Sequence, residues 1–348
     1  MKMPVRSWTL LRLSLLIAGL LFYWPQHVLR AVRAADQSPA DEIGPLFPVV
    51  EHGKWGYIDK TGKIVIPLQY HFAYRFSEGV AWVEPWPNRV MLIDKTGKMV
   101  AMTKIYSFAL PFSEGLALVV VPGERGPGYI DATGKMIVAQ DDSRKGANSF
   151  REGLAPVKED GKWGYIEKTG KMVISPQFSE CGQFVEGLAA VKVGKKWGYI
   201  DKTGKMAIPA QYDVAYVFTE GLAGVRDGEK WSYIDPAGKA VILPQYPEVF
   251  GFSEGLAQVK DGGKWGYIDK TGRMIILPQY DDAQEHSEGL AGVKSGGKWG
   301  YIDKTGKLVI QPQYDKVSVF SEGLASVEVG KKMGYIERSG KSVWAPTK

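Results

Sequence analysis

The stretch FSEGLAQVKDGGKWGYIDKTGRMIILPQYD, residues 252–281, decides the fold. Side chains alternate between two faces in residues 256–260, 265–269 and 274–277, which is the period of a β-strand. The glycine-rich sequence DGGK separates the first two segments, and DKTGR separates the second from the third. PQY ends the third segment, because proline lacks the amide hydrogen that a central strand must donate. The stretch therefore predicts three short strands joined by two hairpin turns.

The same stretch recurs along the chain. Its hexapeptide KWGYID first occurs at residues 54–59, and later copies follow at a spacing that settles at 34 residues. The positions equivalent to its tryptophan are Trp55, Val90, Pro127, Trp163, Trp197, Trp231, Trp265, Trp299 and Met333. Residues 45–348 therefore form nine units. Units two and three are degenerate, because Val90 and Pro127 replace tryptophan and the PQY element is missing.

These motifs bring the chain close to a known family. The unit, with its Trp-Gly pair, resembles the bacterial WG-containing repeat family over residues 46–348. The resemblance implies an exported or envelope-associated bacterial protein, and it implies no particular activity, since none is agreed for such repeats. The departures in units two and three put any binding property of the regular units in doubt there.

A glycine recurs in the turn between the second and third predicted strands. The residue after a type I turn adopts a left-handed conformation that is costly for a side chain with a Cβ atom. The aspartate that opens the turn can accept hydrogen bonds from the turn backbone. We interpret these glycines as structural: Gly62, Gly97, Gly134, Gly170, Gly204, Gly238, Gly272, Gly306 and Gly340.

The architecture follows from the number of strands. Residues 45–348 show no sustained helical period with caps, so we expect an all-β domain. Nine three-stranded antiparallel units give about 27 strands, and an open twisted sheet holds only about ten before it curls. We expect an open β-solenoid or superhelix.

A closed, β-propeller-like ring is the alternative. We disfavour it because propeller blades usually have four strands and about 40–45 residues. Closure also often divides one blade between the termini, whereas unit one begins at its first strand and unit nine ends after its third.

The N-terminal residues have the pattern of a secretory signal. Cations precede the apolar run 13–24, which is shorter than the roughly 20 residues that span a bilayer. Val32 and Ala34 suit a cleavage site, so we expect residues 1–34 to be a signal peptide and 35–44 a mobile lead-in. An uncleaved anchor is the alternative, and it would be the only membrane contact. Either reading exports the repeats to the periplasm or the outside of the cell.

Charge and composition exclude several function classes. Of 44 Lys and Arg residues, five lie in the first 34 residues, so the rest of the chain has 39 basic against 38 acidic residues. Such a balance gives no basic face for nucleic acid. Cys181 is the only cysteine, and the histidines after the signal, His52, His71 and His286, lack metal-ligand spacing. We therefore expect no cofactor and no metal.

Repeated side chains suit structure better than catalysis. Glutamates such as Glu254 precede the glycine of each SEG-type turn, and a residue present in every unit cannot be uniquely tuned as an acid or base. The tryptophans form a same-face row with the tyrosines two residues later. Core packing is our preferred role for the row, and a sugar-binding ladder is the alternative. The structural tryptophans are Trp55, Trp163, Trp197, Trp231, Trp265 and Trp299.

Two tryptophans break the repeat. Trp82 stands where other units have Leu, Pro, Ala, Gly, Gln or Ser, and Trp86 lies in the insertion EPWPN. An aromatic at an exposed tip gains little unless it meets a partner, so the pair is the candidate ligand-binding site. The alternative is that the longer tip folds over unit two and fills the space left by Val90.

Two functions remain after these exclusions. The first is an exported, non-catalytic repeat scaffold at the cell envelope that binds a protein or a cell-surface glycan. The alternative is an envelope carbohydrate-active hydrolase that uses the carboxylates of the repeat surface. Uniform repeats without catalytic singletons favour the scaffold, so we expect no enzyme activity and assign no catalytic residue.

Overall fold

The computed structural model divides the chain into two units, residues 1–42 and 43–348. It describes residues 43–345 except 88, 107, 122 and 124–125. The predicted signal peptide and nearly all of the lead-in lie outside these residues. Every regular element in the described part is a β-strand. It contains no helix that is long and apolar enough to cross a membrane.

The strands form nine antiparallel sheets, which we call blades 1 to 9. Blades 1 to 3 contain β1 (Phe47–Glu51), β2 (Lys54–Ile58), β3 (Ile64–Tyr70); β4 (Phe72–Ala73), β5 (Val80–Trp86), β6 (Arg89–Asp94), β7 (Met99–Tyr106); β8 (Phe108–Ala109), β9 (Leu116–Val120), β10 (Gly128–Asp131), β11 (Met136–Val138). Blades 4 to 6 contain β12 (Arg144–Ala147), β13 (Leu154–Glu159), β14 (Lys162–Glu167), β15 (Met172–Phe178); β16 (Glu180–Cys181), β17 (Ala189–Val193), β18 (Lys196–Ile200), β19 (Met206–Tyr212); β20 (Val214–Ala215), β21 (Ala223–Arg226), β22 (Trp231–Ile234), β23 (Ala240–Tyr246). Blades 7 to 9 contain β24 (Glu248–Ser253), β25 (Leu256–Asp261), β26 (Lys264–Asp269), β27 (Met274–Tyr280); β28 (Asp282–Ser287), β29 (Leu290–Ser295), β30 (Lys298–Asp303), β31 (Leu308–Tyr314); β32 (Lys316–Val317), β33 (Leu324–Val329), β34 (Lys332–Glu337), β35 (Ser342–Trp344).

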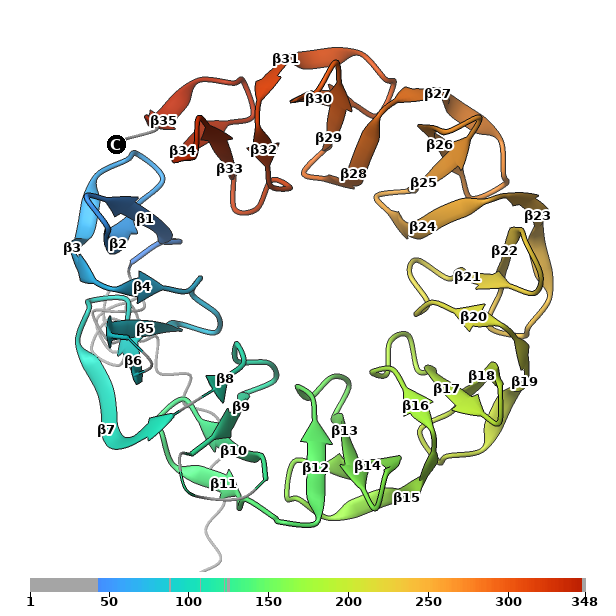
Figure 1. Ribbon diagram of the computed structural model, residues 1–348, viewed down its shortest axis with the longest axis horizontal. Coiled ribbons are helices and arrows are strands. Elements are labelled where there is room, and N and C mark those ends of the chain that lie inside the picture. The colour runs from blue at the N-terminus through green and yellow to red at the C-terminus, as the bar shows by residue number, and fades with distance from the viewer. Residues whose placement is uncertain (1–42, 88, 107, 122, 124–125, 346–348) are drawn as a thin grey trace, which may run out of the picture. The chain divides into compact units, whose positions relative to one another are not determined.

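The blades are arranged in a closed ring, so the domain is a nine-bladed β-propeller (Figure 1). The last strand of each blade lies at the rim, and the first two strands lie nearer the middle. The prediction of an open solenoid was wrong. That prediction assumed that a propeller blade needs more than 34 residues. In this protein the turns have only a few residues, so a 34-residue unit is long enough for four short strands.

The prediction of three strands in each unit was also wrong. In the described part of the chain, eight blades have four strands and blade 1 has three. The additional strand comes from the segment after PQY, for which the sequence analysis predicted no strand: in blade 8, Asp282 pairs with Lys294 and Ser287 with Leu290. In blades 5, 6 and 9 this first strand is only two residues long. So short a strand leaves little alternation to read in the sequence.

The DKTG turn has the geometry that its residues predict. The Oδ1 atom of Asp269 accepts hydrogen bonds from the amide of Thr271 at 2.9 Å, the hydroxyl of Thr271 at 2.6 Å and the amide of Arg273 at 3.1 Å. Gly272 has a φ of +84°, and a Cβ atom there would lie 3.2 Å from Cγ2 of Ile242 in the preceding blade. The glycine therefore serves both the turn and the contact between blades.

The glycine of the Trp-Gly pair has a different purpose. Trp265 pairs with Tyr280 and Tyr267 with Ile276, so the outer strand β27 bulges opposite Gly266. A Cβ atom on Gly266 would lie 2.4 Å from the carbonyl oxygen of Ile276. Only glycine allows the two backbones to approach this closely.

Neighbouring blades are joined through the tyrosine two residues after each tryptophan. The Tyr267 ring is buried against His286 of the next blade, with ring centroids 4.8 Å apart, and its hydroxyl donates to the carbonyl oxygen of Gln284 at 2.7 Å. The same hydrogen bond, with an acceptor in the following blade, is made by Tyr57, Tyr129, Tyr165, Tyr199, Tyr233 and Tyr301. Each such bond is worth about 1 kcal/mol.

The SEG turns add a second link between blades. Glu254 has a φ of +52°, and its carboxylate accepts from the amide of Gly289 in the next blade at 3.0 Å. Lys304 of that next blade lies 3.1 Å from the same carboxylate. Equivalent hydrogen bonds from a glycine amide in the next blade are accepted by the carboxylates of Glu78, Glu114, Glu152, Glu186, Glu220 and Glu288.

The ring closes between blades 9 and 1 by the same kind of contact. The hydroxyl of Tyr335 donates to the carbonyl oxygen of Pro48 at 3.1 Å, and its ring lies 5.5 Å from that of Phe47. Phe47 and Tyr335 belong to one buried cluster with Val49, Ile58 and Leu324. Because packing closes this seam, no blade has to be divided between the termini.

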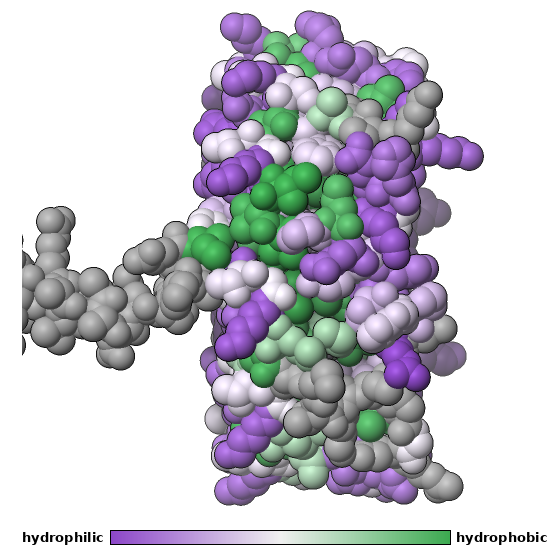
Figure 2. Space-filling model, turned by 90° about the vertical axis from the view of Figure 1, so that its left-hand side faces the viewer, coloured by the Kyte–Doolittle hydropathy of each residue, from purple (hydrophilic) through white to green (hydrophobic). Residues whose placement is uncertain are grey.

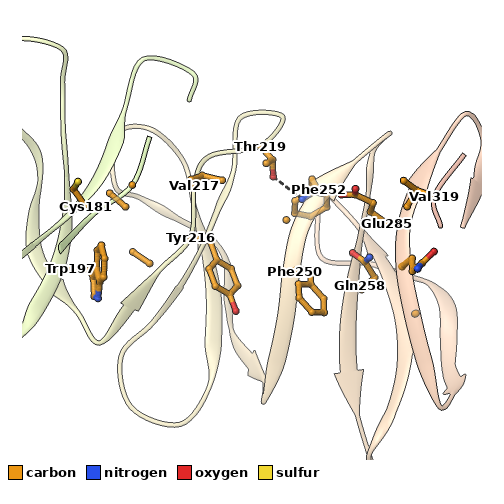
Figure 3. Close-up of a pocket in the computed structure, with 16 residues that line it drawn as sticks. Cys181, Trp197, Tyr216, Val217, Thr219, Phe250, Phe252, Gln258, Glu285 and Val319 are labelled. Atoms are coloured by element: carbon orange, nitrogen blue, oxygen red, sulfur yellow. Dashed lines mark hydrogen bonds between the residues drawn. The ribbon is translucent and has the colours of Figure 1, made fainter. Parts of the chain in front are cut away.

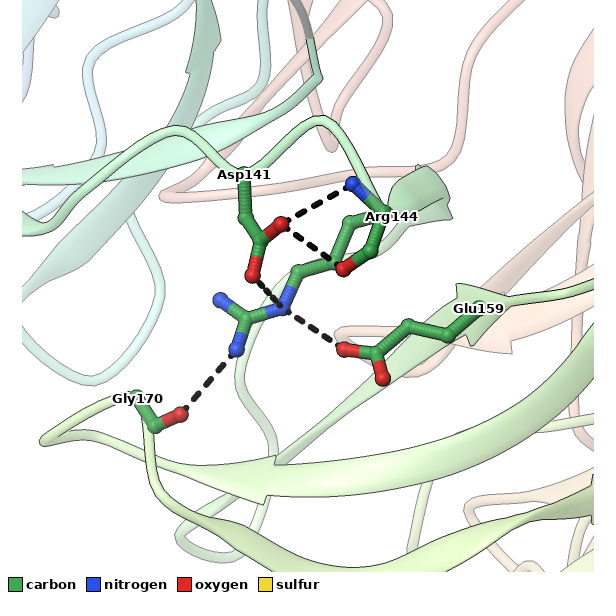
Figure 4. Close-up of polar contacts among 5 residues, drawn as sticks. Asp141, Arg144, Glu159 and Gly170 are labelled. Carbon is green, nitrogen blue, oxygen red and sulfur yellow. Dashed lines mark hydrogen bonds and ion pairs between the residues drawn. The ribbon is translucent and has the colours of Figure 1, made fainter.

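The degenerate units need additional contacts. Blade 3 has an outer strand of three residues, and Arg144 lies at the junction with blade 4 (Figure 4). Its Nε lies 3.1 Å from Glu159 and 3.8 Å from Asp141, and Nη2 donates to the carbonyl oxygen of Gly170 at 3.2 Å. We interpret this ion cluster around the buried Arg144 as a structural replacement for the missing PQY element.

Candidate binding groove

A groove of about 680 Å³ crosses the first strands of consecutive blades (Figure 3). It extends from Cys181 in blade 5 to Val319 in blade 9, and most of its lining is apolar. Trp197, Tyr216, Phe250 and Gln258 follow one another along it. Its size is in the usual range for ligand pockets, which are about 300–1,000 Å³.

The groove is built from one position of the repeat. This groove position is the residue whose carbonyl oxygen accepts the tyrosine hydroxyl of the preceding blade. Gly182, Tyr216, Phe250 and Gln284 occupy it in blades 5 to 8, and all four line the groove. The main chain is therefore fixed by the fold, while the side chain differs from blade to blade.

In blades 6 and 7 the groove position holds an aromatic ring that stacks on the tryptophan of its own blade. The centroids of Tyr216 and Trp231 are 4.4 Å apart with an interplanar angle of 24°, and those of Phe250 and Trp265 are 5.2 Å apart at 26°. A Cβ atom on Gly224 would lie 3.2 Å from Tyr216, so a small residue there leaves room for the ring.

A cation lies over each of these tryptophans. The guanidinium of Arg226 is 5.5 Å from the centroid of Trp231, and the ammonium of Lys260 is 5.4 Å from that of Trp265. Lys192 is 5.8 Å from the centroid of Trp197. Cation–π attraction at these distances holds the indoles in place. The aromatic wall is therefore rigid before any ligand arrives.

Two amides supply the polar groups of the next part of the groove. Gln258 is 3% exposed, and within the described residues its Oε1 atom has no hydrogen-bond partner. Gln284 donates from Nε2 to the carbonyl oxygen of Val317 at 3.0 Å, and its Oε1 atom also lacks a partner in the described part of the chain. An unpaired buried acceptor costs about 1–3 kcal/mol.

Ionisable groups are few in the groove. Glu285 is the one carboxylate among the lining residues, and it is exposed. Burial raises the pKa of the Cys181 thiol to about 12, although the Tyr165 hydroxyl partly offsets this, so the thiol is protonated at neutral pH. Residues 43–345, apart from their gaps, also contain no cluster of three or more His, Cys, Asp or Glu side chains that could hold a metal ion.

Comparison with protein-family models identifies the family of the chain. The model of the WG-containing repeat matches residues 55–84, 91–121, 145–163, 163–197, 197–231, 231–265, 265–299 and 299–332. The chain belongs to the WG-containing repeat family. No curated protein matches this family member in sequence.

Comparison with solved structures gives one likeness in fold and two weaker matches among those described here for this WG-containing repeat protein. A eukaryotic initiation factor has 11% identity and a TM-score of 0.61, covering 86% of this chain and 95% of its own. AztD from Citrobacter koseri has 14% identity and a TM-score of 0.42, covering 85% and 92%. BamB from Moraxella catarrhalis has 10% identity and a TM-score of 0.39, covering 75% and 94%. At such identities, the first likeness shows the fold alone.

The structure separates the two predicted ligand-binding tryptophans. Trp82 is 3% exposed, whereas Trp86 at the β5–β6 tip is 62% exposed. The indole N–H of Trp82 donates to the carbonyl oxygen of Leu110 at 2.9 Å. Leu92 occupies the tyrosine position of this blade, so Trp82 makes the interblade bond that tyrosine makes elsewhere. Trp82 therefore packs between blades 2 and 3 from within β5, which differs from a tip folded over the space left by Val90.

Trp86 lies outside the groove. Apolar side chains gather on the edge shown in Figure 2, on the side of the ring where β3 to β7 lie in Figure 1. The exposed apolar residues of blades 1 to 3 include Ile64, Phe72, Tyr74, Trp86, Met99 and Phe108. A ligand contact at Trp86 stays a prediction.

The glycines and tryptophans that we interpreted as structural lie in turns or are at least partly buried. Gly62, Gly204, Gly272 and Gly306 have φ values from +84° to +87° in their turns. Trp231 and Trp265 are buried, while Trp55, Trp163, Trp197 and Trp299 are half-buried. Tyr216, Phe250 and Gln284 were missed as site residues. Their one sequence signal was variation at a position 17 residues after the repeated tyrosines Tyr165, Tyr199, Tyr233 and Tyr267.

Proposed function

We propose that the protein is a non-catalytic binding module whose ligand occupies the groove across blades 5 to 9. The observation that carries the proposal is the side-chain variation at the groove position, which presents Gly, Tyr, Phe and Gln on a main chain held in one geometry. Repeat scaffolds recognise ligands through such a surface. Rigid aromatic walls and few polar groups are also usual for a binding pocket.

The arrangement of the carboxylates supports binding over hydrolysis. Burial raises the pKa of Glu220, but hydrogen bonds from Lys270 and from the Gly255 amide outweigh it and hold the pKa below its usual value. Glu114, Glu152 and Glu254 have equivalent lowered pKa values and contacts. A glycosidase needs a protonated acid beside a second carboxylate about 5–9.5 Å away. Carboxylates tied to neighbouring turns suit neither role.

The proposed module acts outside the cytoplasm. The support is the sequence pattern of residues 1–34, with cations before a short apolar run and a site for cleavage after Ala34. Intact-mass measurement of the protein recovered from the cell envelope or medium is expected to give a chain that begins at Ala35. Full-length protein in the cytoplasm would contradict export.

Binding without reaction can be tested directly. The full chain is incubated with mixed oligosaccharides and with a peptide library, captured, and its bound material is identified by mass spectrometry. We expect a retained ligand of unchanged mass, and we expect its loss from the Tyr216→Ala/Phe250→Ala variant. Cleavage products would contradict a non-catalytic role, and equal retention by the variant would contradict the groove.

A further inference from the structure

We propose that the groove binds an uncharged oligosaccharide, with sugar rings against the aromatic wall and hydroxyls on the two amides. The proposal rests on the proposed binding function and adds the chemical class of the ligand. It is carried by the order of the lining groups: three aromatic surfaces from blades 5 to 7, followed by Gln258 and Gln284 from blades 7 and 8.

The aromatic wall offers flat surfaces in consecutive blades. In blade 5 the groove position is Gly182, so Trp197 itself lines the groove. In blades 6 and 7 the indole is covered by Tyr216 or Phe250, and that added ring becomes the surface. Phe250 is 46% exposed although Trp265 lies against it, which leaves ring surface for a ligand. The electron-rich face of an aromatic ring attracts the partly positive C–H groups on a sugar face.

The glutamines match hydroxyl groups. An amide donates and accepts at the same time, as a hydroxyl does. Both glutamines line the groove, and the terminal amide torsion of glutamine is broad, so the amide of Gln258 can rotate to present its unpaired Oε1 atom to a ligand. A ligand hydroxyl would then satisfy an acceptor that has no partner in the described part of the protein.

The charges around the groove and the lengths of its first strands favour an uncharged ligand over a charged one or a peptide. The cations Lys192, Arg226 and Lys260 contact the tryptophans, and Glu285 is the single carboxylate among the lining residues, so a charged ligand finds no built counterpart. A peptide that extends a sheet needs a strand edge of several residues. The first strands of blades 5, 6 and 9 are two residues long and provide no such edge, and the six-residue strands β24 and β28 give one only in blades 7 and 8, which is part of the length of the groove.

The test uses defined probes. Cellohexaose, chitohexaose, xylohexaose, mannohexaose and laminarihexaose are titrated separately into the full chain by isothermal calorimetry. We expect saturable binding of at least one, weakened about tenfold by Phe250→Ala and by Tyr216→Ala, as loss of one stacked ring predicts. Gln258→Leu is expected to weaken binding similarly. Phe72→Ala is the matched control, because Phe72 is an exposed aromatic outside the groove.

Each outcome decides the proposal. Thermal unfolding first establishes that the variants remain folded. Absence of binding by all five hexasaccharides at millimolar concentration overturns it, as does equal weakening by Phe72→Ala. If a peptide from the library binds instead and is lost in Phe250→Ala, the binding function stands and the oligosaccharide class falls. If neither class binds, both fall.

Discussion

His286 shows how one residue can disagree with its repeat. It occupies the slot that phenylalanine fills in most other blades, is 0% exposed, and neither ring nitrogen makes a hydrogen bond of ordinary geometry within the described residues. Burial lowers its pKa, and the nearby Asp303 backbone and Glu254 only partly offset this. The folded state therefore holds the neutral imidazole.

Replacing this histidine is expected to stabilise the fold. His286→Phe should raise the free energy of unfolding by about 1–3 kcal/mol, because it removes two unpaired buried polar atoms. The folded pKa lies below the unfolded value, so the unfolded state binds the proton first and stability falls as pH drops below about 6.5. Urea titrations at pH 8 and pH 5 measure both effects. An equal pH response in the variant would contradict this.

Replacing the glycine of the DKTG turn is expected to destabilise the fold. Gly272→Val should lower the free energy of unfolding by about 2 kcal/mol or more, because a β-branched residue is forced into φ of +84° and against Ile242. Gly262→Asn is the control, since Gly262 has a φ of +55° with nothing within 4 Å and asparagine tolerates this region. Equal costs for the two variants, measured by thermal unfolding, would reject the geometric explanation.

Blade 2 shows compensation between elements. Trp82 on β5 supplies the donor and ring that Leu92 on β6 lacks, and it packs against Tyr106 and Phe112. Trp82→Ala is expected to cost about 3–5 kcal/mol. Adding Leu92→Tyr should recover part of this, because it restores the arrangement of the regular blades. A double-mutant cycle by urea unfolding measures the coupling, and strictly additive effects would disprove it.

The sequence predicted some elements better than others. The strands around KWGYID and the DKTG turn were recognisable, because their alternation and their glycine are local properties. The first strand of each four-stranded blade was not, since β16 and β20, for example, have two residues each and take their conformation from pairing with the next strand. The groove could not be predicted, because Tyr216 and Phe250 come together only when consecutive blades pack against each other.

The hydrogen bond across the seam between blades 9 and 1 distinguishes a closed ring from an open array. Tyr335→Phe removes only the hydroxyl that reaches Pro48 across the seam, and Tyr301→Phe removes its counterpart within the ring. Both should lower the free energy of unfolding by about 1 kcal/mol. An open array would leave Tyr335 without an acceptor and make its variant silent. Guanidinium unfolding of the two variants side by side makes this measurement.

The bond between blades has a consequence for how this protein can change over generations. Its acceptor is always a backbone carbonyl, so this hydrogen bond does not depend on the side chain of the residue that provides it. Glycine, tyrosine, phenylalanine and glutamine all provide this carbonyl acceptor. Mutation can therefore sample new recognition surfaces at each of these sites with little risk of unfolding, and duplicated units can diverge in specificity while keeping one common architecture.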